Sequence, residues 1–347
     1  MKKWTAVTSV ILIALGNPAS AQSQKVDTEN LMSQAFGLVN QVNGSRVITV
    51  LKSQPTAAFS ADDAEVRECM LDKLNLKIPI LIPDRLKDAK ARQIMSSYRL
   101  YWRSSMLNSG KISKYEKTLV LSLASVVGRP DLKTMETIEP IVIAKLKGEG
   151  LYAQAGQTGP LRELMLWTKQ DDVIYDVALP EGLYRPTVRK MDDFISLGWN
   201  SYHTCGRSGT GGWAENDILH LVVPNYSSLE DEDFKVNFLA HETQHFSDIK
   251  RFVGLEDWHL EYRAKLVELA TANSTRVDIL RRFSNDQGDD KNSPHSFANK
   301  KLLNALRLQL GLSSASGLSA VPVATLQKAA LTELLADSKG LEMTRLK

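Results

Sequence analysis

The sequence reads NFLAHETQHFSDIKRF over residues 237–252 and carries two histidines four positions apart. Ser228 and the acidic residues that follow it predict the start of a helix that continues through this stretch. On a helix, residues four apart lie one turn from each other on the same side, so His241 and His245 would be neighbours. Glu242 would lie about a third of a turn around the same helix.

This spacing is typical of a metal site. Two imidazoles one turn apart can share one ion, and a glutamate beside them can act as a general base toward water. The residues between the histidines, Thr243 and Gln244, are uncharged, which favours a helix that is partly buried. The alternative is an ordinary helix with two histidines that are solvated or satisfied within the core.

A catalytic zinc site needs a third protein ligand and an open position. The best candidate is Glu261, sixteen residues after His245, in the segment WHLEYRAKLVELA. A short turn followed by an antiparallel helix would bring Glu261 back beside the histidines. The alternatives are a site without a third ligand, or one completed by His259, Glu256 or Glu268.

With these residues, the chain resembles the gluzincin metallopeptidases, which pair His-Glu-x-x-His with a glutamate on a following helix. The resemblance covers roughly residues 170–310 and includes the pattern Glu261-x-x-Ala264. It implies a zincin-like fold in which a small sheet precedes the motif helix. It also implies Zn2+ bound by His241, His245 and Glu261, and hydrolysis of peptide bonds by zinc-activated water with Glu242 as the general base.

The chain departs from the thermolysin-like members at one position. Those members carry an acid four residues after the glutamate, where it supports a ligand histidine, and Lys265 stands there in this chain. Asp248, seven residues after His241, is the alternative supporting acid. The third histidine of the metzincins is absent, because Arg251 occupies its position, and the aspzincin pattern is absent too.

Three residues are candidates for a role in substrate binding. His295, at a predicted helix start, is the candidate catalytic donor to the oxyanion, and Tyr226 and Tyr262 are alternatives. The strand predicted over residues 217–224, with GGWA at 211–214 before it, would present an open edge to an extended peptide.

We predict an α+β chain that is mostly helical. Residues 22–165 form an N-terminal helical region of open role, and residues 166–347 form the zincin-like metallopeptidase domain. Within the second part, the pattern around Pro180-Glu181-Gly182 predicts a hairpin. One long helix is expected over residues 255–283, and Gly340 is expected to end the last helix.

The first 21 residues are typical of a secretory signal peptide. Two lysines precede an apolar run over residues 4–16, which is shorter than the ~20 residues a membrane span needs. Cleavage after Ala21 would place the protein in the periplasm or outside the cell, with no later membrane span. An uncleaved membrane anchor is the alternative. The net charge would fall from +3 to +1, which gives no electrostatic argument for nucleic acid.

The chain has two cysteines, Cys69 and Cys205. In an exported chain they often pair, and this pair would constrain the unfolded state by roughly 4–5 kcal/mol. Two buried free thiols are the alternative.

The function that these patterns predict is that of an exported zinc metallopeptidase acting on a peptide or protein. A cell-wall stem peptide is an alternative substrate, because its amide bond is the same. The alternative function is an exported helical binding or assembly protein whose metal site is structural or vestigial.

Overall fold

The computed structural model describes residues 28–215, 218–313 and 317–345. The fold is α+β and mostly helical, as predicted. The predicted signal peptide, residues 1–21, lies outside the described residues. Within the described ranges, no helix combines the length and the apolar character that crossing a membrane requires.

The N-terminal part is a layer of helices around its own core. The aromatic rings of Tyr98 and Trp102 are fully buried in that core. The helices are α1 (Thr28–Asn40), α2 (Gly44–Leu51), α3 (Ala61–Lys73), α4 (Ala89–Leu107), α5 (Ile112–Val127) and α6 (Met135–Gly148). Asp88 caps the start of α4, the longest of these helices, by accepting a hydrogen bond from the backbone N–H of Ala91. The next helix, α5, ends at Gly128, which has a left-handed backbone conformation.

A five-stranded sheet follows in the order β1-β2-β5-β7-β6, and in it only β5 and β7 run parallel. The predicted hairpin at Pro180-Glu181 is confirmed and joins two short strands, β3 and β4. The strands are β1 (Tyr152–Thr158), β2 (Leu161–Ile174), β3 (Val177–Leu179), β4 (Gly182–Tyr184), β5 (Thr187–Leu197), β6 (Gly212–Glu215) and β7 (Ile218–Val222).

The helical region ends earlier than predicted. Residues 152–165, expected to be part of it, form β1 and the start of β2. The strand β1 reads YAQAGQT, and its mostly small and polar residues give no apolar alternation by which a strand could be recognised.

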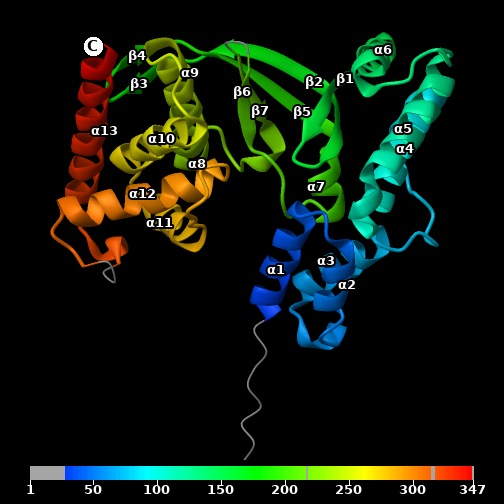
Figure 1. The fold of residues 1–347 in the computed structure, drawn as a ribbon, viewed down its shortest axis with the longest axis horizontal. Coiled ribbons are helices and arrows are strands. Elements are labelled where there is room, and N and C mark those ends of the chain that lie inside the picture. The colour runs from blue at the N-terminus through cyan, green and yellow to red at the C-terminus, as the bar shows by residue number, and fades with distance from the viewer. Residues whose placement is uncertain (1–27, 216–217, 314–316, 346–347) are drawn as a thin grey trace, which may run out of the picture.

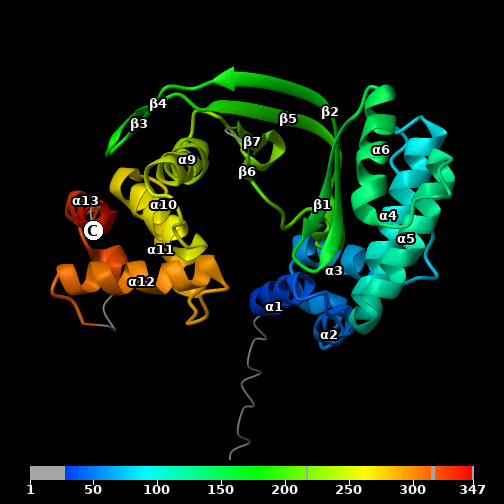
Figure 2. The same ribbon diagram turned by 45° about the horizontal axis from the view of Figure 1, so that its top comes forward.

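The sheet connects the two groups of helices. Leu164 and Leu166 of β2 are buried in the N-terminal core, and Leu219 and Leu221 of β7 are buried in the C-terminal core. Figure 1 shows the sheet between the two groups, and in Figure 2 the long strands β2 and β5 run from one to the other.

The C-terminal part differs from expectation in two helices. The predicted helix over residues 255–283 breaks at 272–275, where the Glu232 carboxylate accepts hydrogen bonds from the backbone N–H groups of Asn273 and Thr275. The last helix continues past Gly340, since a glycine inside a helix costs only about 1 kcal/mol. The helices of this part are α8 (Glu232–Phe234), a π-helical turn (Lys235–Ala240), α9 (His241–Arg251), α10 (Asp257–Thr271), α11 (Arg276–Asn285), α12 (Pro294–Gln309) and α13 (Val323–Arg345). The short helix α7 (Gly198–His203), which follows β5, instead packs on the N-terminal core through Trp199.

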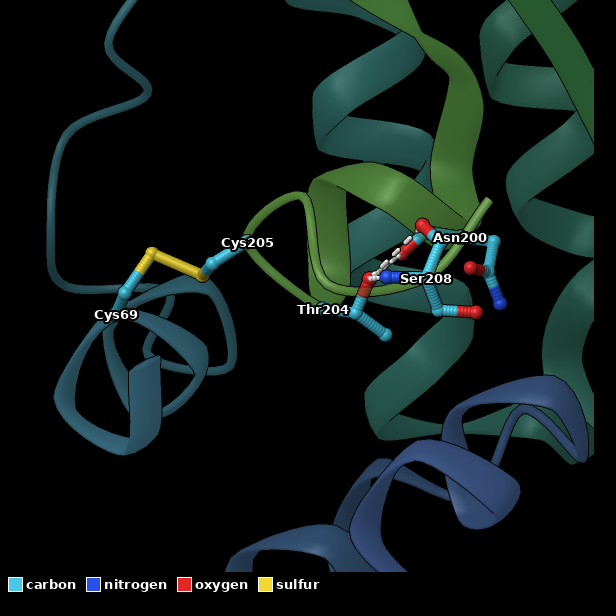
Figure 3. The surroundings of a disulfide bond; sticks show 5 residues. All are labelled: Cys69, Asn200, Thr204, Cys205 and Ser208. Atoms are coloured by element: carbon cyan, nitrogen blue, oxygen red, sulfur yellow. Dashed lines mark hydrogen bonds between the residues drawn. A yellow bond between two sulfur atoms is a disulfide. The ribbon is translucent and has the colours of Figure 1, made fainter. Parts of the chain in front are cut away.

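A disulfide joins Cys69 of α3 to Cys205, which follows α7, and this confirms the pairing (Figure 3). The neighbouring Thr204 is fixed as well. Its hydroxyl donates to the carbonyl of Asn200 and accepts from the N–H of Ser208. The bond therefore anchors the start of the glycine-rich loop GRSGTGG, residues 206–212, which follows Cys205.

Reduction of this disulfide is expected to lower the free energy of unfolding by about 5 kcal/mol, because the bond closes a long loop in the unfolded chain. Denaturant titrations with and without reductant measure the change. The Cys69→Ser/Cys205→Ser double variant is the control and should not respond to reductant. An unchanged unfolding midpoint in the native chain would contradict the expectation.

Candidate metal centre

The helices α9 and α10 bring the three predicted ligands together. The Nε2 atoms of His241 and His245 lie 3.0 Å apart. From Glu261, Oε1 lies 3.3 Å from the Nε2 of His245, and Oε2 lies 3.7 Å from the Nε2 of His241. Donors bound to a tetrahedral zinc at ordinary bond lengths stand about 3.3–3.4 Å from one another, so this donor set fits such an ion.

A buried arginine holds the two helices in register. Arg263 of α10 is fully buried, and its Nε lies 2.8 Å from the Oδ2 of Asp248 on α9. The same guanidinium pairs with Asp337 of α13 and with Glu181 in the β3–β4 turn, each at 2.8 Å. The prediction that Asp248 orients a ligand histidine is therefore wrong, because Arg263 and Gln244 take its oxygens.

The acid that supports a ligand histidine is Glu268. Its Oε1 lies 2.6 Å from the Nδ1 of His241, an arrangement that leaves Nε2 facing Glu261. Glu268 was expected only as an alternative third ligand. It stands seven residues after Glu261, about two turns further along the same face of α10. The Nδ1 of His245, by contrast, is buried and has no hydrogen-bond partner among the described residues.

Glu261 has the charge that a ligand needs. Burial alone would raise its pKa, but hydrogen bonds with His245 and His295 lower it well below the usual range, so the carboxylate stays ionised. The ammonium of Lys265 also lies close, with its Nζ 3.4 Å from the Oε2 of Glu261. The lysine at the position of the expected acid thus pairs with the ligand itself.

Three residues considered for the site lie elsewhere. His259 and Glu256, alternative ligands, and Tyr262, an alternative oxyanion donor, each contact a side chain outside the cluster. His259 lies 2.9 Å from Asp337, Glu256 lies 2.8 Å from Lys291, and Tyr262 lies 2.6 Å from Glu333.

Glu242 faces a cavity of about 330 Å³ beside the histidines. Within the described chain it makes no hydrogen bond or ion pair, which leaves its carboxylate available to a bound water or substrate. Tyr226 and Arg282 line the same cavity. Burial raises the pKa of Tyr226 well above its usual value. The phenol therefore stays protonated, and its O–H group can donate a hydrogen bond. Arg282 is a lining residue that the sequence did not single out.

His295 lies beside Glu261, but not beside Glu242, where a donor to the oxyanion was expected. It stands in the first turn of α12, and its Nδ1 is 2.8 Å from the Oε2 of Glu261. Its side chain is 64% exposed, and it does not line the cavity that contains Glu242. His295 therefore contacts a ligand, and Tyr226 is the predicted donor that lies beside Glu242.

No family model matches the chain, and neither a curated protein nor a solved structure matches it. We therefore infer what the chain does from the side chains of the site.

The edge of the sheet near the site is formed by β6. We expected an open edge on the strand over residues 217–224, with GGWA at 211–214 before it. The expectation is wrong for β7, which pairs with β5 on one side and with β6 on the other, but residues 212–214 of the GGWA segment belong to β6, which lies at the edge. The free edge belongs to β6, which begins at Gly212. This glycine lines the cavity, and a Cβ there would lie 2.2 Å from both the Phe238 ring and the carbonyl oxygen of His220.

Proposed function

We propose that this chain is a zinc-dependent metallopeptidase with a zincin-like catalytic part. One observation carries the proposal: His241, His245 and Glu261 converge within one ion's reach, and Glu242 lines the adjacent cavity with no hydrogen bond or ion pair to any described residue. Zinc, when bound, supplies the Lewis acidity for hydrolysis of an amide bond. The substrate is a peptide or protein. A cell-wall stem peptide is an alternative substrate, because it contains the same type of amide bond.

The side chains supply the remaining steps. Glu242 accepts a proton from the attacking water and then passes it to the leaving amine. Tyr226, which keeps its phenolic proton, is placed to donate a hydrogen bond to the oxyanion that forms on the substrate carbonyl. The edge strand β6 offers backbone groups to an extended substrate.

Export is part of the proposal. The N-terminal 21 residues are typical of a cleavable signal peptide, and the Cys69–Cys205 disulfide suits an oxidising compartment. We propose a periplasmic or secreted protein that begins at Gln22 after cleavage.

The test is the metal content of residues 22–347 together with a peptide-library screen. We expect about one zinc per chain, and cleavage that stops with a chelator and returns when zinc is added. No bound zinc, even after zinc is supplied, would overturn the proposal. That result would favour a binding or assembly protein, whose partner interaction a chelator leaves unchanged.

Glu268→Ala is expected to weaken zinc binding by about 10–100-fold, because it removes the partner that orients His241. Competition with a chromophoric chelator measures the change in affinity. The control is Glu256→Ala, which removes an exposed glutamate that pairs with Lys291 outside the cluster. Equal zinc affinities in the two variants would contradict the role of Glu268.

A further inference from the structure

A second and larger cavity adjoins the metal centre. Its volume is about 750 Å³, and α1, β1, β2, α7 and the glycine-rich loop all contribute to its wall. Gly209 lines both this cavity and the one that contains Glu242. His295, which contacts Glu261, also lines it. A substrate held at the metal centre could therefore extend into this second cavity.

One wall of this cavity holds a buried carboxylate. Glu163 of β2 is only 8% exposed. Its Oε1 accepts hydrogen bonds from the backbone N–H groups of Leu164, at 2.9 Å, and Trp199, at 3.0 Å. Its Oε2 has no hydrogen-bond partner in the described part of the chain.

The space for this carboxylate depends on Gly198. A Cβ at this position would lie 2.3 Å from the Oε1 of Glu163 and 2.6 Å from its Oε2. Gly198 also has a φ of +92°, which side-chain-bearing residues rarely adopt. The backbone at Gly198 and Trp199 thus forms a cradle for the carboxyl group.

No described residue that lines the cavity gives the Glu163 carboxylate a lysine or arginine partner. Among the described residues that line the cavity, only Glu163 and His295 have ionisable side chains, and the others are amide, hydroxyl, aromatic, apolar or glycine. Burial raises the pKa of Glu163 to about 7, as expected where no positive side chain offsets the desolvation. Buried carboxylates in proteins are normally paired with a positive group. Glu163 has no such group among the described lining residues, and a ligand could provide it.

Helix capping accounts for only part of this arrangement. Glu163 does bind the first turn of α7, but α7 has six residues and uses only Oε1. Capping alone gives the Oε2 atom no function. The side-chain oxygen of a neutral glutamine would cap the helix equally well.

We propose that this cavity binds a positively charged group of the substrate, an ammonium or guanidinium, against the Oε2 of Glu163. The group is either a lysine or arginine side chain or a free α-amino terminus. This inference extends the proposed peptidase by naming a charge in its substrate, and it concerns binding rather than hydrolysis.

The test measures peptide binding to the zinc-loaded Glu242→Gln variant, which we expect to cleave peptides too slowly to disturb the measurement. Fluorescence anisotropy compares matched peptides with lysine or norleucine at one position, each with a free or acetylated N-terminus. We expect about 10–100-fold tighter binding of the charged peptide, and loss of this preference on Glu163→Gln, which keeps the Oε1 acceptor. Loss of the preference on acetylation would identify the α-amino group, and loss with norleucine would identify the side chain.

Two results would overturn the proposal. One is an equal affinity for charged and neutral peptides in the protein that retains Glu163, which can be measured even if Glu163→Gln fails to fold. The other is a preference for the charged peptide that is unchanged in Glu163→Gln and equal to that of the exposed control Glu149→Gln. Binding with the expected preference but no cleavage by the native chain would reject the peptidase and retain this subsite.

Discussion

Glu242→Gln is expected to bind zinc as tightly as the native chain and to hydrolyse peptides about 10²–10⁴-fold more slowly. The amide has nearly the same size and shape as the carboxylate, but it cannot accept a proton from water. Glu242 makes no hydrogen bond or ion pair with the described residues, so little else in the fold depends on its charge. Zinc content and the rate of cleavage of one library-derived peptide, measured on the same preparation, check both halves of the prediction.

The matched control is Glu256→Gln, which makes the same chemical change at an exposed glutamate outside the cluster. It should leave both zinc content and cleavage rate unchanged. Activity retained by Glu242→Gln would exclude this residue as the general base. Loss of zinc in that variant would instead show that Glu242 takes part in binding the metal.

Glu261→Ala is expected to lower zinc affinity by more than about 100-fold, since the loss of a direct ligand should exceed the 10–100-fold typical of an outer partner. A second effect adds to the first. Lys265 and His295 both lie beside the Glu261 carboxylate, at 3.4 Å and 2.8 Å, and would remain without it. The positive charge of the Lys265 ammonium would then oppose the entry of a cation between the two histidines.

His245→Ala should have a similar effect, because His245 supplies one of the three atoms proposed to bind the ion. Elemental analysis after dialysis, followed by chelator competition, measures both variants. His259→Ala is the control, since this histidine binds Asp337 outside the cluster. Full zinc occupancy in Glu261→Ala would show that the third ligand has been misassigned.

The ligand cluster was predictable because its geometry is mostly local. His241 and His245 need only a helix between them, and Glu261 needs only a second helix that returns antiparallel to the first. The supporting acid was not predictable in the same way. Asp248 and Glu268 both stand seven residues from a ligand on a helix, and spacing cannot distinguish them. The buried guanidinium of Arg263 decides the matter by binding Asp248, and that contact depends on the tertiary packing of α9 against α10.

Features that depend on pairing between distant segments were also missed. The strand β1 has no apolar alternation, and β7 became an interior strand only because β6 pairs beside it. The cradle of Glu163 joins β2 to the start of α7, 36 residues further along the chain. Cysteine content suggested a disulfide, but only the fold brings the Cα atoms of Cys69 and Cys205 to 6.3 Å.

The disulfide also determines what happens to a nicked molecule. A single backbone cut anywhere between residues 69 and 205, by the protein itself or by another protease, leaves two fragments that are still covalently joined. Such a molecule would run as one band on a denaturing gel without reductant and as two bands with it. The span between the cysteines includes β1, β2 and β5, so the strands that connect the two helical groups can be cleaved without releasing either group.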